Sequence, residues 1–215
     1  MKKRVLILLV VMLLTVSGAM AAESKYSKYY FSLGVNLSKS DYVYHGESGT
    51  EGIFPKDPDK TGGIAMGAEF RLNLGYFRLD INGDFSVLTP QFLYFNGMSD
   101  VGVSIDIKDV VGIGFGLGPS MTFMFFSDGR TPIYIDTDDD YSTKEASIFY
   151  AWVHSHFNYR ITLDAIVGPV MRVGLAYTFP TKFNLELFKI GELNPFKKGN
   201  IDSGRLAVCL QMRLF

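Results

Sequence analysis

The feature that most constrains the fold is an unbroken alternation of apolar and polar residues between Phe77 and Val87. The odd-numbered positions carry Phe, Leu, Ile, Phe and Val with one glycine among them, and the even-numbered positions carry Arg, Asp, Asn, Asp and Ser. Successive side chains of a β-strand point to opposite faces, so this segment has one apolar face and one ionic face. Strands of a soluble β-sandwich also alternate. Whether this strand belongs to a soluble or a membrane protein must therefore be judged from how the pattern recurs along the chain.

The alternation recurs in eight segments, which predicts an all-β chain. These segments are 29–38, 63–74, 77–87, 101–108, 111–125, 149–164, 170–179 and 205–215. The connections between them are long and short in turn, and the long ones are 39–62, 88–100, 126–148 and 180–204. An outer-membrane barrel has short periplasmic turns and long external loops. The pattern therefore predicts an eight-stranded antiparallel transmembrane β-barrel with both termini periplasmic.

The charged faces decide which side of the predicted sheet meets water. A soluble barrel turns its apolar face inward and its charged face to water. A membrane barrel is the reverse: its apolar face meets lipid and its charged face lines the interior. An open sheet edge leaves backbone groups unpaired in hydrocarbon, so the sheet must close. Ten strands are the alternative, if 131–136 and 183–190 are counted. The first of these is shorter than the ~9–11 residues that a tilted strand needs to cross the bilayer.

Residues 1–21 have the three parts of a secretory signal peptide. Residues 2–4 are basic, residues 5–16 are apolar, and Ala-Met-Ala at 19–21 is a small-x-small cleavage site. A retained membrane helix is the rival interpretation, but the apolar run is shorter than the ~20 residues of a membrane span. We therefore expect a signal peptide over 1–21 and one barrel domain over 22–215. No later segment reaches the ~18 apolar residues typical of a membrane helix.

Charge and cysteine content exclude some functions for residues 22–215. Removal of three basic residues leaves 18 Lys and Arg (21 minus 3) against 22 Asp and Glu, a balance that offers no support for a nucleic-acid partner. Cys209 is the only cysteine, so no internal disulfide can form.

The ionic faces place a nearly balanced set of charges inside the predicted barrel. These charges could pair with one another and hold a narrow core together. They could instead line a pore and set its selectivity. The first interpretation fits a non-conducting structural or surface-interaction barrel that acts through its external loops, and the second fits a narrow porin-like channel for small solutes, which we expect. The residues are Glu69, Arg71, Arg78, Asp80, Asp84, Asp106, Lys108, Arg160, Asp164, Arg172, Arg205 and Arg213.

Four glycines at alternate positions between 112 and 118 share the inner face of one predicted strand. A face without side chains leaves room for long side chains from other strands. We therefore interpret these glycines as packing positions and not as a phosphate-binding loop.

No catalytic or metal site is predicted. His154 and His156 would share the inner face of strand 149–164, but two histidines without a third ligand do not define a metal site. His45 with a nearby serine is the one loop combination that resembles a nucleophile and its base, and it lacks a defined orienting partner. We therefore expect neither a cofactor nor an enzymatic activity.

The signal peptide, the sorting of the loops and the terminal Phe215 resemble those of small bacterial outer-membrane barrels of the OmpA-transmembrane, OmpX and OmpW types. The resemblance covers residues 22–215 as a pattern, and no motif selects one subfamily. It implies residence in the cell outer membrane, contact with its lipid and a lipopolysaccharide-like surface, and recognition of the C-terminal strand by the barrel-assembly machinery. An OmpW-like barrel would pass small hydrophobic molecules through a more apolar interior. In that family the terminal aromatic residue continues the outward alternation, whereas Phe215 is out of phase with Leu206–Leu214.

Overall fold

A computed structural model describes most of the chain. The described residues are 28–39, 42–44, 53–55, 64–89, 92–126, 133–135, 143–144, 148–194 and 204–214. The predicted signal peptide, His45 and Phe215 lie outside them.

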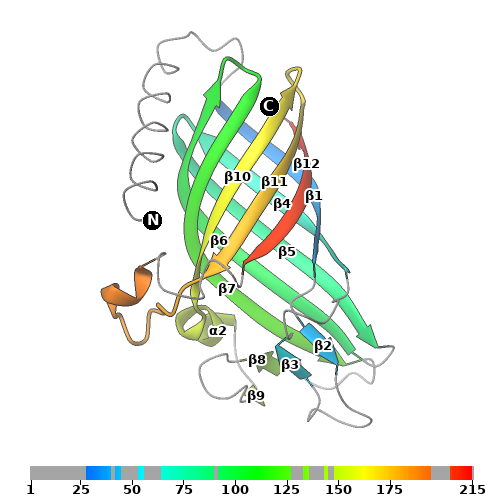
Figure 1. The fold of residues 1–215 in the computed structure, drawn as a ribbon, viewed down its shortest axis with the longest axis vertical. Coiled ribbons are helices and arrows are strands. Elements are labelled where there is room, and N and C mark those ends of the chain that lie inside the picture. Colours follow the sequence, from blue (N-terminus) through cyan, green and yellow to red (C-terminus); the bar gives the residue numbers. More distant parts are fainter. Residues whose placement is uncertain are drawn as a thin grey trace, which may run out of the picture.

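Eight antiparallel strands close into a barrel (Figure 1), which confirms the predicted fold class. In chain order they are β1 (Tyr29–Lys39), β4 (Ile64–Leu74), β5 (Phe77–Thr89), β6 (Phe92–Ile107), β7 (Val111–Phe126), β10 (Phe157–Val167), β11 (Met171–Pro180) and β12 (Arg205–Arg213). The first and last strands pair from Ser32 opposite Arg213 to Ser38 opposite Ala207, and β7 pairs with β10. Each strand of the barrel therefore has two neighbours, and no edge is left open.

The ten-stranded alternative is wrong. β8 (Ile133–Ile135) has three residues and pairs with β7 outside the closed barrel, where it continues to β9 (Thr143–Lys144). Residues 183–190 form turns and not a strand. Neither segment is long enough to cross a bilayer as a strand.

The two ends of the barrel differ in their connections (Figure 1). One end holds three tight turns, at 75–76, 108–110 and 168–170, together with the start of β1 and the end of β12. Gly75 and Gly168 have φ angles of 72° and 66°, a left-handed conformation that suits glycine in a tight turn. The opposite end, which we call the loop end, holds the other elements. They are β2 (Tyr42–Tyr44), β3 (Ile53–Pro55), β8, β9, α2 (Ile148–His154) and the 3₁₀ helix η2 (Ile190–Leu193).

The barrel is apolar outside and polar inside. Along β12 every second side chain is buried, and the exposed ones between them are Leu206, Val208, Leu210 and Met212. Soluble proteins bury such residues, whereas hydrocarbon is the solvent that suits an apolar exterior. The fold is therefore that of a small outer-membrane β-barrel. Within the described residues, no helix combines the length and apolar character that a membrane crossing requires.

One predicted long loop is mostly strand. β6 begins at Phe92 and not at Val101, so residues 92–100 extend the hairpin of β5 and β6 and leave a short connection. The run from Phe92 to Phe95 lacks alternation, which hid it from the sequence pattern. Its backbone pairs with the far half of β7, up to Phe92 opposite Phe126. β6 and β7 each have 16 residues, more than the ~9–11 that cross a bilayer, so this hairpin extends past the span at the loop end.

The predicted strand 149–164 is also wrong in its first part. Ile148–His154 is a helix, α2, and the strand starts only at Phe157. On the helix the buried Ala151 packs with Phe123 and Tyr134.

Candidate functional site

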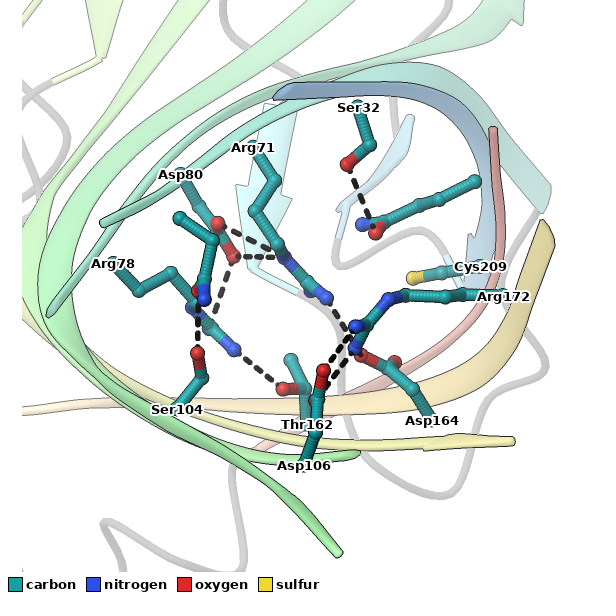
Figure 2. Close-up of polar contacts among 12 residues, drawn as sticks. Ser32, Arg71, Arg78, Asp80, Ser104, Asp106, Thr162, Asp164, Arg172 and Cys209 are labelled. Atoms are coloured by element: carbon teal, nitrogen blue, oxygen red, sulfur yellow. Dashed lines mark hydrogen bonds and ion pairs between the residues drawn. The ribbon is translucent and has the colours of Figure 1, made fainter. Parts of the chain in front are cut away.

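The interior of the barrel is organised around Arg71, which extends from β4 across the barrel (Figure 2). Its Nε lies 3.1 Å from Asp80 Oδ1, its Nη2 lies 3.0 Å from Glu69 Oε1 and its Nη1 lies 2.6 Å from Asp164 Oδ2. Asp80 is directly opposite Arg71 on β5, while Asp164 comes from β10 on another wall. A single guanidinium group therefore connects three carboxylates from three strands.

Two further arginines extend this network. Arg78 places Nη2 2.9 Å from Asp80 Oδ2, and its Nη1 donates to Thr162 Oγ1 at 2.5 Å. Arg160 places Nη2 2.6 Å from Glu69 Oε2 and 3.8 Å from the sulfur of Cys209. Arg71, Arg78 and Arg160 thus share two carboxylates between them, so the charges form one connected cluster.

A second group of contacts lies toward the tight turns. Arg172 binds Asp106 with two hydrogen bonds, of 2.9 Å from Nη1 and 2.5 Å from Nη2. Its guanidinium also lies over the ring of Tyr30, 4.5 Å from the centroid, and the Arg213 guanidinium lies 4.2 Å from the same centroid. Cation–π contacts of this kind are stronger when they are shielded from water, as here, where Tyr30 is buried.

A third group lies toward the loop end. Arg205 Nη1 is 3.0 Å from Asp84 Oδ2, and the Ser38 hydroxyl donates to the same oxygen at 3.3 Å. Ion pairs therefore occur at three levels along the barrel.

The glycines of β7 provide the space that these side chains occupy. A Cβ at Gly114 would collide with Arg78 Nη1, and a Cβ at Gly116 would collide with a carboxylate oxygen of Asp100. At Gly112 it would lie 2.8 Å from Arg172 Nη1. The interpretation of these glycines as positions that leave room for long side chains is confirmed for Gly112, Gly114 and Gly116, whereas a Cβ at Gly118 would collide with the backbone carbonyl of Ser99.

The central level of the barrel is closed to water. Glu69, Arg71, Arg78, Asp80 and Asp100 each expose 1% or less of their surface. Water therefore has almost no room beside them. Buried charges are stable only when they are paired, and Glu69, Arg71 and Asp80 are paired here, whereas neither carboxylate oxygen of Asp100 has a hydrogen-bond partner among the described residues.

One predicted interior position is wrong, and one interior residue was not predicted. Lys108 is exposed in the turn between β6 and β7, with φ of 50°, because β6 already ends at Ile107. Asp100 was assigned to a loop, whereas it lies in β6, 1% exposed, with Arg78 Nη2 at 3.7 Å. The signal that could have revealed it is its spacing from Ser104 and Asp106, at even positions on the same strand face.

The structure places the other predicted charged side chains in the interior of the barrel. Asp106 is the most accessible of them, and its carboxylate is held by Arg172. The side chains that point inward are Glu69, Arg71, Arg78, Asp80, Asp84, Asp106, Arg160, Asp164, Arg172, Arg205 and Arg213.

The two histidines do not share a strand face, and that prediction is wrong. His154 ends α2, where its Nδ1 lies 2.9 Å from the carbonyl oxygen of Tyr150 and its ring stacks on the Tyr150 ring. Its Nε2 lies 3.4 Å from Glu186 Oε2, so the ring links two segments of the loop end. His156 lies in the linker between α2 and β10. Among the described residues, no group of three or more His, Cys, Asp and Glu side chains could hold a metal ion.

Comparison with solved structures finds bacterial outer-membrane barrels. Ail, the attachment invasion locus protein of Yersinia pestis, is 8% identical with a TM-score of 0.42, over 87% of this chain and 97% of that chain. Ail in complex with the heparin analogue sucrose octasulfate is 10% identical with a TM-score of 0.40 over the same shares of the two chains. Neisserial surface protein A is 9% identical with a TM-score of 0.40, over 87% of this chain and 96% of that chain. No protein-family model and no curated protein matches the chain.

Proposed function

We propose that the protein is an integral outer-membrane barrel with a closed interior, and that it acts through the surface at its loop end. The apolar exterior supports membrane residence, because exposed residues such as Leu163 and Val208 fit hydrocarbon and not water. The sorting of tight turns to one end supports an orientation with the loop end outside the cell and both ends of the barrel sheet periplasmic.

The main observation in support of a closed interior is that the charged side chains at the central level are buried. Arg71 connects β4, β5 and β10 through its carboxylate partners, so it bridges the cross-section. A permeating ion would have to displace this side chain from its three partners and leave Asp164, whose other arginine lies 3.9 Å away, without a close counter-ion, which is costly in a dry site. The carboxylates Glu69, Asp80 and Asp164 are each engaged by arginine, so we assign no reaction to them.

A narrow channel for small solutes remains the second candidate. The observation in its favour is that the same residues carry charges of both signs along the barrel axis, at three levels. If the pairs exchanged partners, these charges would line a polar path, and their order would set selectivity.

Planar-bilayer recording of the refolded protein separates the two functions. We expect no unitary current from the unaltered protein. The double variant Arg71→Ser with Asp164→Ser removes the bridge and is expected to admit small ions. Leu163→Ala changes the adjacent lipid-facing residue and should stay closed. Regular unitary currents from the unaltered protein would overturn the closed-interior proposal and support the channel.

The orientation is tested by labelling on intact cells with a membrane-impermeant maleimide. Lys189 and Lys108 are both exposed, the first at the loop end and the second in a tight turn. We expect Lys189→Cys to be labelled on intact cells, and Lys108→Cys only after the outer membrane is permeabilised. The reverse result would invert the orientation.

The partners that we propose follow from this location. They are outer-membrane lipid, a lipopolysaccharide-like surface around the loop end, and the barrel-assembly machinery, which would read the C-terminal segment of the chain, including Phe215. A small solute is a partner only in the channel alternative. Impaired assembly on deletion of Phe215, measured as the folded fraction in the outer membrane, would support the role of that residue.

A further inference from the structure

The loop end carries an apolar surface beside the barrel wall, which we call the lateral foot. It consists of α2 and residues 181–194. Ile148, Phe149 and Trp152 are exposed on α2, at the i, i+1 and i+4 positions that share one side of a helix. Phe149 is 74% exposed and Phe188 is 63% exposed, against 52% for Leu163 in the middle of the lipid-facing wall. Large apolar side chains with this exposure indicate an interaction surface.

Hydrogen bonds join the two parts of the lateral foot, α2 and residues 181–194. The backbone amide of Leu185 donates to the carbonyl of Val153 in α2 at 3.1 Å, and His154 pairs with Glu186. The side chain of Asn184 accepts a hydrogen bond from the Leu187 amide at 2.9 Å. These contacts hold the apolar residues outward instead of letting them collapse against one another.

The foot lies against the outside of the wall and not over the mouth of the barrel. Tyr159 is on the outward face of β10, and its hydroxyl donates to the carbonyl of Leu193 at 2.8 Å. Phe179 has the outward parity of β11, yet it is only 5% exposed. Its ring lies 5.4 Å from that of Tyr159, which in turn lies 5.3 Å from that of Phe115 on β7. Figure 1 shows the orange segment that contains η2 standing to the side of the barrel, where β11 ends and β10 begins.

We infer that the lateral foot rests in the interface of the bilayer that surrounds the barrel, with Trp152, Phe188 and Ile190 among the lipids of the adjacent leaflet. This inference rests on the proposed membrane function. The foot covers Phe179, whose ring is linked through Tyr159 to Phe115 on the exposed outer wall, so the foot adjoins the surface that lipid covers. Trp and Phe side chains with lysines beside them are typical of membrane interfaces, and Lys182 and Lys189 are exposed on the same segment.

The single tryptophan of the chain makes the inference measurable. The refolded protein is placed in phosphatidylcholine vesicles whose acyl chains are brominated close to the headgroup, and Trp152 fluorescence is recorded. We expect strong quenching by the brominated lipid. Quenching by aqueous iodide should be several-fold weaker than in the urea-unfolded chain.

A control reporter separates this inference from the proposed function. In a Trp152→Phe background, Ile161→Trp places the reporter on the lipid-facing wall of β10, where Ile161 is exposed. If that reporter is not quenched by brominated lipid, the membrane-barrel proposal itself fails. If it is quenched while Trp152 is quenched only by iodide, the foot lies in water and the inference alone is overturned. Shielding of Trp152 from both quenchers would indicate a cover of protein, such as a second copy, and would also overturn it.

A matched pair of variants tests which residues anchor the foot. Phe188→Ser with Ile190→Ser should raise iodide quenching of Trp152 several-fold and reduce quenching by brominated lipid. Val110→Ser with Val170→Ser removes exposed apolar residues of the tight turns and should leave both values unchanged. No difference between the pairs would contradict anchoring by Phe188 and Ile190.

Discussion

Arg71→Met is the substitution that most directly probes the interior. It removes a guanidinium group that is 1% exposed, keeps a long apolar stem, and breaks three ion pairs at once. The substitution leaves the three carboxylates with different numbers of remaining arginine partners. Glu69 retains Arg160 at 2.6 Å and Asp80 retains Arg78 at 2.9 Å. Asp164 retains only Arg172 Nη1 at 3.9 Å, so it becomes the uncompensated charge.

The expected change in the free energy of unfolding follows from this difference between the three carboxylates. Removing one partner of a buried ion pair costs about 3–5 kcal/mol, because the other charge stays buried. We expect the lower part of that range for Arg71→Met, since two of its three partners keep an arginine. Adding Asp164→Asn removes the uncompensated charge and should recover about 2 kcal/mol.

Urea unfolding of the refolded protein in lipid vesicles, followed by far-ultraviolet circular dichroism, measures these differences. Leu163→Met, on the lipid face next to Asp164, is the control and should change the free energy of unfolding by less than about 1.5 kcal/mol. A cost below about 1 kcal/mol for Arg71→Met, or no recovery on adding Asp164→Asn, would refute the view that unpaired burial dominates.

Three further predictions test the wall and its packing. Leu163→Arg should lower the free energy of unfolding in vesicles by about 2–4 kcal/mol, because it places a cation on the lipid face near the middle of β10. Gly114→Ala should cost about 1–3 kcal/mol in the same assay by overpacking, whereas Gly191→Ala, where a Cβ meets nothing within 4 Å, should be nearly neutral. Cys209 is buried in the wall beside Arg160, so maleimide should not label it until the barrel is unfolded, as judged by mass spectrometry. Labelling of the folded protein would show that the interior opens.

The fold was predictable because period-2 alternation survives in nearly every strand. β12 shows why: each apolar side chain from Leu206 to Met212 meets the exterior and each residue between them meets the interior. In a barrel wall every second residue faces lipid and must be apolar, while the residues between them face the interior. Each position of a strand therefore has a defined polarity. The direction of the faces followed from charge, since Arg71 and Asp80 cannot face hydrocarbon.

The parts that could not be predicted are those where backbone pairing or helix contacts replace alternation. Residues 92–95 are all apolar or aromatic, and they become strand because they pair with the extension of β7 beyond the bilayer. Asp100 keeps the alternation with Ser104 and Asp106, and it was missed because the predicted strand begins at Val101. α2 was missed because Ala151 is fixed by contacts with Phe123 and Tyr134, which come from distant parts of the chain.

The closed interior that we propose depends on strand number more than on composition. Arg78 of β5 reaches Thr162 of β10, and its guanidinium occupies the space over Gly114 of β7. Eight strands leave an interior just wide enough for side chains to fill, and the diameter grows with each added pair. Two more strands would widen the interior and lengthen the distance that Arg78 spans to Thr162. The charges alone therefore fit either function that the sequence left open, and the closure of β7 onto β10 is what favours a filled barrel.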